Sequence, residues 1–473
     1  MPKTKVKISE IPSSIIVTVP PPAEAAVPMP TITSPVDRIL PPENFTTAGE
    51  VVNFRDSWRI FKIISEFIDG YDFLKQFKRE VTILGSARLP KNDHYYKEAE
   101  ELGYMLAKNG FTTITGGGPG IMEAANRGAF EGGGETVGIN IQLPFEQRIN
   151  PYVKHSVGFY YFFTRKVMLT SPANAFVFFP GGFGTLDEFF EVVDYMELGY
   201  MPKSPIVLVG HTFWDPIIKF LKENSNGLVH SVSEEIIDSW KVAHTAVEAF
   251  EFIKDAEDRP NEFDTTPDQI QSKGGPDWRV FRIMAELVDG FEFLAKMKNE
   301  VTIFGTKNIL PGSSYYQAAQ ATGELLAKNG YSIITGGGAG TMEAASRGAF
   351  EAGGESIGMT IVRESAVQNN NYLTKSIGFS FPFVRKLIIT APSKAFVFFP
   401  GGFGTLHQLF ELLTLQETGK MPRTPVILYG RDFWHPMIEY FRMLYGNFKT
   451  ISMVDQKLVN VVDRPEEILK FIK

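Results

Sequence analysis

Cysteine is absent from the 473 residues of this chain, and its absence excludes several kinds of chemistry. The chain can form no disulfide, offers no thiolate nucleophile and has no cysteine-based zinc or iron–sulfur site. Proteins of the reducing cytoplasm generally lack disulfides. We therefore expect a cytoplasmic protein.

Long apolar runs are also missing. The first apolar run, residues 14–19, is followed by three prolines at positions 20–22. It is too short for the core of a signal peptide or for a membrane span. Since no other stretch reaches spanning length without charges, we expect a soluble chain with no membrane partner.

An excess of positive charge is the third absence, because the formal net charge is −7. This balance argues against a nucleic acid as the main partner, since phosphate backbones favour a basic surface. Small anionic ligands are not excluded, because backbone amides at a helix N-terminus bind phosphate whatever the net charge. Hydrophobic residues make up 44% of the chain, enough for large buried cores.

The chain repeats itself at an offset of 220 residues. The stretch from Ala175 to Leu186 recurs letter for letter from Ala395 to Leu406, and Trp58 matches Trp278. A repeat of this length indicates duplicated domains rather than solenoid units. The predicted organisation is a disordered proline-rich tail (1–45), a first domain (46–254), a linker (255–275) and a second domain (276–473).

Short apolar runs alternate with helical patterns in each copy. In the first copy the expected strands are 81–84, 111–115, 136–141, 175–179 and 206–209, and the expected helices are 58–77, 95–109, 121–131 and 186–196. Apolar strands that alternate with helices favour a parallel sheet covered on both faces. The predicted fold class is α/β, with two tandem doubly wound, Rossmann-like domains.

Two glycine-rich loops follow expected strands and precede expected helices. The first contains Gly116, Gly117, Gly118 and Gly120, and the second contains Gly181, Gly182, Gly184 and Thr185. Such loops let a ligand approach the backbone amides of a helix N-terminus, although tight turns alone remain an alternative. Neither loop matches a Walker A or a G-x-G-x-x-G motif, which disfavours a kinase and an NAD dehydrogenase.

The stretches from Gly116 to Gly128 and from Pro180 to Glu188 together resemble the LOG family, also labelled lysine decarboxylase-like. Residues 85–88, 143–147 and the Arg165–Lys166 pair are similar to the longer bacterial-type members. Characterised members are nucleoside 5′-monophosphate phosphoribohydrolases. The resemblance implies hydrolysis of an N-glycosidic bond without a cofactor, with Arg165 and Glu188 in the positions of the family's catalytic residues.

The residue types suit this chemistry. Breaking the bond at ribose C1′ passes through an oxocarbenium-like state, which a carboxylate such as Glu188 stabilises while it activates water. Arg165 could hold phosphate or ribose oxygens or polarise the base. The expected substrate-binding residues are Ser86, Arg88, Gly116, Gly117, Gly118, Gly120, Glu123, Lys166, Gly181, Gly182, Gly184, Thr185 and Glu191, with no metal. Thr185 and Glu188 also fit a helix capping box, which remains an alternative for this motif.

The second copy keeps Arg385, Lys386, Glu343 and Glu411 but departs at the proposed acid–base position. There Gln408 replaces Glu188, His407 replaces Asp187 and Asn308 replaces Arg88, and residues 363–367 differ from 143–147. Glutamine satisfies a capping box but cannot carry the charge, so we expect a catalytically disabled domain with a structural or regulatory role.

The family is commonly dimeric, so the two copies are expected to form an intrachain pseudo-dimer, and a homo-oligomer of whole chains is also expected. The expected ligand is a nucleoside monophosphate. An alternative function is a non-catalytic nucleotide-binding sensor or scaffold. An amino-acid decarboxylase is disfavoured, since no motif identifies a Schiff-base lysine.

Overall fold

A computed structural model describes residues 17–18, 54–142, 149–257, 276–295, 297, 299–362 and 369–472. The expected tail lies outside the described residues except for the two-residue strand β1 (Val17–Thr18). The expected linker lies outside them from residue 258 onward, as does the motif at 143–147.

The first copy forms one sheet. Its strands are β2 (Glu80–Leu84), β3 (Thr112–Thr115), β4 (Thr136–Ile141), β5 (His155–Phe159), β6 (Ala175–Phe178), β7 (Ile206–Val209) and β8 (Lys241–Ala243). They are parallel in the order β5-β4-β3-β2-β6-β7-β8, and β1 pairs antiparallel with β5 at the edge. The apolar runs predicted as strands are therefore buried interior strands, as a sheet covered on both faces requires.

The second copy repeats this sheet. Its strands are β9 (Glu300–Phe304), β10 (Ser332–Thr335), β11 (Ser356–Ile361), β12 (Lys375–Phe379), β13 (Ser393–Phe398), β14 (Val426–Tyr429) and β15 (Val459–Val462). All are parallel, in the order β12-β11-β10-β9-β13-β14-β15. The prediction of two tandem doubly wound α/β domains is confirmed.

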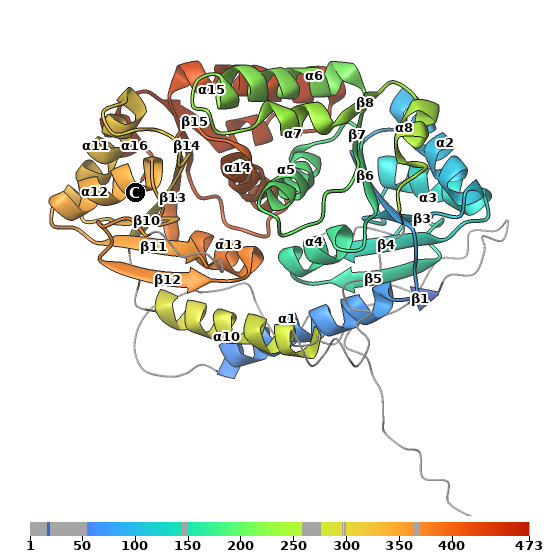
Figure 1. Cartoon of the computed structure of the whole chain (residues 1–473), viewed down its shortest axis with the longest axis horizontal. Coiled ribbons are helices and arrows are strands. Elements are labelled where there is room, and N and C mark those ends of the chain that lie inside the picture. The colour runs from blue at the N-terminus through green and yellow to red at the C-terminus, as the bar shows by residue number, and fades with distance from the viewer. Residues whose placement is uncertain are drawn as a thin grey trace, which may run out of the picture.

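Helices cover both faces of each sheet (Figure 1). In the first copy they are α1 (Phe54–Leu74), α2 (His94–Lys108), α3 (Ile121–Glu131), α4 (Phe162–Thr170), α5 (Phe183–Glu197), α6 (His211–Phe220), the π-helix η2 (Leu221–Asn226), α7 (Glu234–Ser239) and α8 (Ala246–Ile253). In the second copy they are α10 (Pro276–Leu294), α11 (Ser314–Lys328), α12 (Thr341–Glu351), α13 (Pro382–Thr390), α14 (Phe403–Glu417), α15 (Arg431–Met443), η3 (Leu444–Phe448), η4 (Asp455–Leu458) and α16 (Pro465–Ile468). Among the described residues, none of these helices is both long and apolar enough to cross a bilayer.

The two copies pack against each other along three pairs of equivalent helices. In Figure 1, α5 and α14 lie side by side at the centre, α6 and α15 lie above them, and α1 and α10 cross below. Phe190 stacks on its equivalent Phe410, with ring centroids 5.3 Å apart and planes 5° apart. Phe163 stacks on Phe383 at 5.9 Å. Because aromatic side chains bury large apolar areas, these contacts join the two copies through one hydrophobic core.

The strand order brings three loops of each copy together. In the first copy, β3, β2 and β6 are neighbours, and the chain runs outward from β2 in one direction before returning to the other side. Ligands of open parallel sheets bind beyond the carboxyl ends of strands at such a switch point. Ser86 follows β2, the first glycine loop follows β3 and the second glycine loop follows β6. The strand order therefore places all three at the same edge of the sheet.

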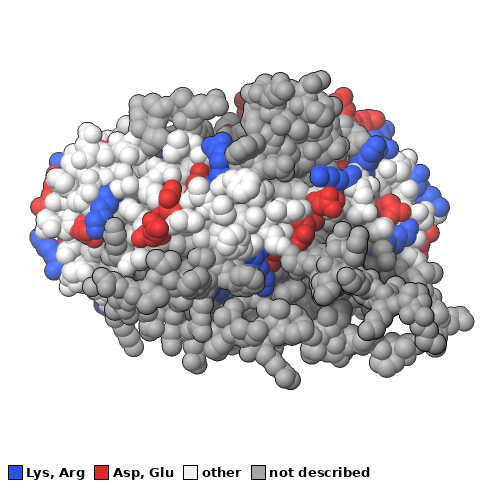
Figure 2. Space-filling model, turned by 90° about the horizontal axis from the view of Figure 1, so that it is seen from below, with Lys and Arg blue, Asp and Glu red and all other residues white. Residues whose placement is uncertain are grey.

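The face that α1 and α10 cross carries interspersed acidic and basic side chains where it is described (Figure 2). Both signs occur side by side on this face, with uncharged residues between them. Its described part therefore offers mixed charge rather than a field of one sign.

Candidate functional site

The first glycine loop is held in a shape that only glycine adopts easily. Gly117 and Gly120 have φ angles of +71° and +67°, in the left-handed region. The side-chain amide of Asn150 donates hydrogen bonds to the carbonyl oxygens of Gly117 and Gly118, at 3.1 and 3.0 Å. A β-carbon at Gly116 would lie 2.6 Å from Nη2 of Arg165, so this glycine makes room for the guanidinium.

Ser86 connects the two glycine loops. Its amide donates to the carbonyl of Pro180 at 3.0 Å, and its own carbonyl accepts from the amide of Ile121 at 3.0 Å. A β-carbon at Gly120 would lie 2.3 Å from that carbonyl oxygen. The ends of three neighbouring strands are therefore tied together by backbone contacts.

The second glycine loop contacts the other copy. A β-carbon at Gly182 would lie 2.7 Å from the carbonyl oxygen of Thr450, and one at the equivalent Gly402 would lie 2.4 Å from that of Ser231. Each loop thus approaches backbone of the other copy too closely for a larger residue. We call these two reciprocal contacts the loop seam.

The capping-box interpretation of Thr185 and Glu188 is wrong. Helix α5 begins at Phe183, its N-cap is Gly182, and no side chain caps it. The carbonyl of Gly182 already accepts from the amides of Thr185 and Leu186, so the chain is helical before Thr185. The same holds for Gln408, since α14 begins at Phe403 with Gly402 as its N-cap. The residue at position 188 is therefore free of a capping role.

Helix α4, which carries Arg165 and Lys166, was not predicted, and a buried acid of α1 fixes its start. The carboxylate of Glu66 accepts from the amides of Tyr160 and Tyr161, at 2.7 and 3.3 Å, and from the Thr164 hydroxyl. A carboxylate at a helix N-terminus satisfies unpaired amides and complements the helix dipole. This contact sets the direction in which α4 presents its two cations.

Arg165 and Glu188 meet between the glycine loops. Nη1 of Arg165 lies 3.3 Å from Oε1 of Glu188, and Nε donates to the carbonyl of Ile139 at 3.0 Å. The second carboxylate oxygen of Glu188 is buried and accepts no hydrogen bond from the described residues. The geometry thus offers one unengaged carboxylate oxygen beside a fixed guanidinium.

The environment of Glu188 suits proton transfer. Burial raises the pKa of Glu188 to about 7, against the opposing effects of Lys166 and Arg165, and the nearby Glu191 and Asp187 add to the rise. Burial likewise lowers the pKa of Arg165, although Glu188 opposes this. A carboxyl group with a pKa near the working pH exchanges protons readily, as general acid–base catalysis requires.

Lys166 and Glu191, both expected to bind substrate, lie in a buried ion-pair cluster. Nζ of Lys166 lies 2.8 Å from Oδ1 of Asp187 and also pairs with Glu191. All three side chains are at least 97% buried. Lys166 thus joins the two carboxylates, although Oδ2 of Asp187 is buried and accepts no hydrogen bond from the described residues.

This cluster continues into the second copy. Nδ1 of His407 lies 2.9 Å from Asp194, and Nε2 lies 3.3 Å from Glu191. Burial and Lys386 oppose protonation of His407, but its hydrogen bonds with the two acids raise its pKa above the ordinary value. Burial also opposes ionisation of Glu191, yet Lys166, Lys386 and His407 hold its pKa below the ordinary value.

Asp187, Glu191 and His407 have ligand atoms close enough for one metal ion, within 4.8 Å of one another. The ammonium of Lys166 already bonds to Asp187 and pairs with Glu191. A second cation beside that ammonium would be repelled in a buried site, where charges are poorly screened. The residues therefore fit an ion-pair network rather than a metal centre.

Two other expected binding residues have partners at the edge of the site. Nη2 of Arg88 lies 2.6 Å from Glu417 and 3.9 Å from Asp455, both in the second copy. Burial, with Asp455 nearby, raises the pKa of Glu417 to about 7. Glu123 pairs with Lys91 at 2.8 Å.

Sequence reasoning missed the groups that shape the site from a distance. These are Glu66, Asn150, Asp194 and Glu417, together with the pairing role of His407, which the sequence showed only as the replacement of Asp187. Their partners lie on other elements or in the other copy, so spacing along the chain carried no signal for most of them. The 220-residue offset was a partial signal, because it shows Asp194 replaced by Thr414 and Asp187 replaced by His407.

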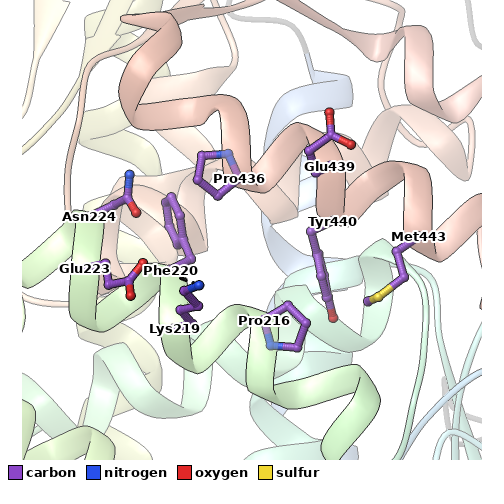
Figure 3. A pocket seen from close by; sticks show the side chains of 9 residues that line it. All are labelled: Pro216, Lys219, Phe220, Glu223, Asn224, Pro436, Glu439, Tyr440 and Met443. Carbon is purple, nitrogen blue, oxygen red and sulfur yellow. Dashed lines mark ion pairs between the residues drawn. The ribbon is translucent and has the colours of Figure 1, made fainter.

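A pocket of about 310 Å³ lies away from this site, between α6 and α15 (Figure 3). Pro216 and Pro436 line it from equivalent positions, as do Phe220 and Tyr440. Residues of both copies line it, and it contains none of the residues expected to bind substrate.

Comparisons with known proteins agree with this architecture. A family model described as "Possible lysine decarboxylase" matches residues 122–253 and 329–472, more than half of the chain. The cytokinin riboside 5′-monophosphate phosphoribohydrolase LOG of Oryza sativa subsp. japonica is 31% identical over 178 residues, covering 36% of this chain and 72% of that protein. LOG3 of Arabidopsis thaliana, of the same named activity, is 26% identical over 190 residues, covering 39% and 87%.

Among solved structures, a molybdenum cofactor binding protein from Rippkaea orientalis is 22% identical, with a TM-score of 0.30, covering 37% of this chain and 95% of that one. In the first copy the family model matches the stretch from β4 to β8 with the second glycine loop, and in the second copy it matches the stretch from β10 to β15 with both glycine loops. The chain belongs to the family described as possible lysine decarboxylases, the LOG family, and carries two members of it in tandem.

Proposed function

We propose that the first copy hydrolyses the N-glycosidic bond of a nucleoside 5′-monophosphate, releasing the free base and ribose 5-phosphate. The observation that carries this proposal is the Arg165–Glu188 pair, 3.3 Å apart between two glycine loops, with one oxygen of Glu188 unengaged. The relatives named as phosphoribohydrolases support the reaction class.

The residues divide the work as follows in this proposal. The first glycine loop and the start of α3 hold the phosphate through backbone amides. Ionised Glu188 faces C1′, stabilises the positive charge that develops as the C1′–N bond breaks, and takes a proton from the attacking water. Arg165 holds a ligand oxygen and keeps Glu188 in place. The water oxygen bonds to C1′ as the C1′–N bond breaks, and the departing base takes up the proton that Glu188 gained from that water.

In this proposal the buried cluster supports Glu188 rather than touching substrate. Lys166 keeps Asp187 and Glu191 ionised behind it, and the second copy supplies His407 and Lys386 to the same cluster.

We also propose that the two domains span residues 46–254 and 276–473, and that whole chains pair with one another.

The test is a panel of nucleoside 5′-monophosphates with detection of free base, including adenosine 5′-monophosphate and a cytokinin riboside 5′-monophosphate. The full chain should release base from at least one member. Glu188→Gln should lower kcat about 10²- to 10⁴-fold, the usual contribution of a general acid–base group.

The matched control is Glu131→Gln, which removes an exposed carboxylate paired with Arg127 on α3 and should leave turnover within about twofold. Full turnover by Glu188→Gln would contradict the assignment. Binding of nucleotides without release of base from any of them would favour the non-catalytic sensor instead.

A further inference from the structure

The second copy has lost the acid but keeps the shape of the ligand loop. Gly337 and Gly340 have φ angles of +75° and +66°, as in the first copy. The side-chain amide of Asn370 donates to the carbonyls of Gly337 and Gly338, both at 3.1 Å. These are the hydrogen bonds that Asn150 makes in the first copy, so the second copy keeps the loop conformation that we propose for phosphate binding.

The guanidinium of Arg385 occupies the same place as that of Arg165. A β-carbon at Gly336 would lie 2.5 Å from its Nη2, and its Nε donates to the carbonyl of Met359 at 2.6 Å. Arg165 has Glu188 as a partner, but no carboxylate of the described residues lies within 4 Å of Arg385. Burial lowers the pKa of Arg385, opposed most by Asp194 of the first copy.

The Arg385 side chain is only partly exposed. A partly buried guanidinium without a carboxylate in contact is costly, and an anionic ligand would offset that cost. Beside it, the amides of Gly338 and Gly340 have no acceptor among the described residues, and helix α12 begins at the next residue. Both features favour an anion at this point.

A second unengaged group faces the ligand position. Gln408 is 7% exposed, and its side-chain oxygen accepts no hydrogen bond from the described residues. It occupies the place of Glu188, whose carboxylate reaches the guanidinium of Arg165 in the first copy. Since a buried amide oxygen without a donor costs free energy, a hydroxyl group of a ligand would satisfy it.

We propose that the second copy is a binding site that holds a ribose 5-phosphate group without cleaving it. Arg385 and the loop amides would bind the anionic oxygens, and Gln408 would accept a ribose hydroxyl. Gln408 cannot ionise, so no base activates water and the C1′–N bond stays intact. The ligand is either an intact nucleoside monophosphate or the free sugar phosphate. Only the choice of this ligand class depends on the function proposed for the first copy.

Calorimetry on the full chain tests it with two probes. Ribose 5-phosphate is titrated into the unsubstituted chain, and adenosine 5′-monophosphate is titrated into Glu188→Gln, where turnover is blocked. We expect two equivalents of at least one probe per chain. The probe that fills the Arg385-dependent site distinguishes the intact nucleotide from the sugar phosphate.

Matched variants assign the sites. Arg385→Gln should remove one equivalent and keep the other, and Arg165→Gln should remove the other. If Arg385→Gln unfolds the chain, Gly336→Ala serves instead, because its β-carbon would displace the guanidinium, with Gly116→Ala as its counterpart in the first copy.

The outcomes separate this inference from the proposed function. A single equivalent that Arg165→Gln abolishes, or no binding of either probe, overturns the inference. Turnover by the chain with a single equivalent contradicts the inference alone. Two equivalents without cleavage of any nucleotide in the panel contradict the proposed function alone.

Discussion

The facing helices α5 and α14 show how the two copies have diverged. At four equivalent positions α5 carries Asp187, Glu188, Glu191 and Asp194, whereas α14 carries His407, Gln408, Glu411 and Thr414. The lysines behind them, Lys166 and Lys386, remain in both copies. At these four positions, four carboxylates on α5 thus correspond to a single carboxylate and a histidine on α14.

The side chains of the second copy thus balance the negative charge of the first. Two unchanged copies would place eight carboxylates around one buried axis, and burial of that much like charge is strongly unfavourable. His407 instead bridges Asp194 and Glu191 of the first copy. The substitutions on α14 therefore help to keep the acids of the first copy paired.

The largest expected effect comes from making the two copies alike. His407→Asp would place a carboxylate against Glu191 and Asp194, with Lys386 offsetting only part of the repulsion, so we expect a loss of about 3 kcal/mol in the free energy of unfolding. Denaturant unfolding measures it. His435→Asp, at an exposed histidine 3.9 Å from Glu439, is the control and should change stability by about 0.5 kcal/mol. Equal effects of the two variants would show that the cluster does not couple the copies.

The next prediction concerns the pH dependence of activity. Because Glu188 must be ionised and burial raises its pKa to about 7, kcat/KM should fall about tenfold per pH unit below pH 7. Asp187→Asn removes a neighbouring negative charge and should shift this limb to lower pH. A profile that is flat down to pH 5 would contradict the role of Glu188 as the base.

A smaller effect should appear in the pH dependence of stability. The pKa of His407 is raised in the folded chain, so its protonation stabilises the fold fully below its ordinary value of about 6.5. That contribution is lost as pH rises through the higher folded pKa. The difference in unfolding free energy between the unsubstituted chain and His407→Asn should therefore shrink from pH 6 to pH 9. A constant difference would mean that His407 acts without its charge.

The smallest expected effect is at the edge of the site. Arg88 is 44% exposed, so its pair with Glu417 is partly screened by solvent. Arg88→Ala should lower stability by about 1 kcal/mol or less, measured by thermal unfolding, and the second copy offers Asn308→Ala as the matched change. A much larger loss for Arg88→Ala would show that this pair holds the copies together.

The sequence predicted the elements that local patterns define. Helix α3 and strands β4 and β7 were placed at their observed ends, because glycine and apolar runs mark them clearly. Strand β5 and helix α4 were missed. Half-buried residues interrupt the apolar pattern of β5, and α4 has only nine residues.

The candidate site divides in the same way. Glycine loops could be recognised locally, whereas the pairing of His407 with Asp194 joins residues more than 200 positions apart. The capping box failed because the backbone of Gly182 had already started the helix, which a side-chain motif cannot reveal.

The loop seam has a consequence for how such a chain can change over generations. Gly182 and Gly402 each press against backbone of the other copy, so neither loop is complete alone. In a dimer of identical subunits, every mutation enters both sides of such a contact at once. Joining the copies in one polypeptide keeps the halves together at any concentration and lets each mutation enter one side only. Duplication thus freed one half to lose its acid while still supporting the loop of the other.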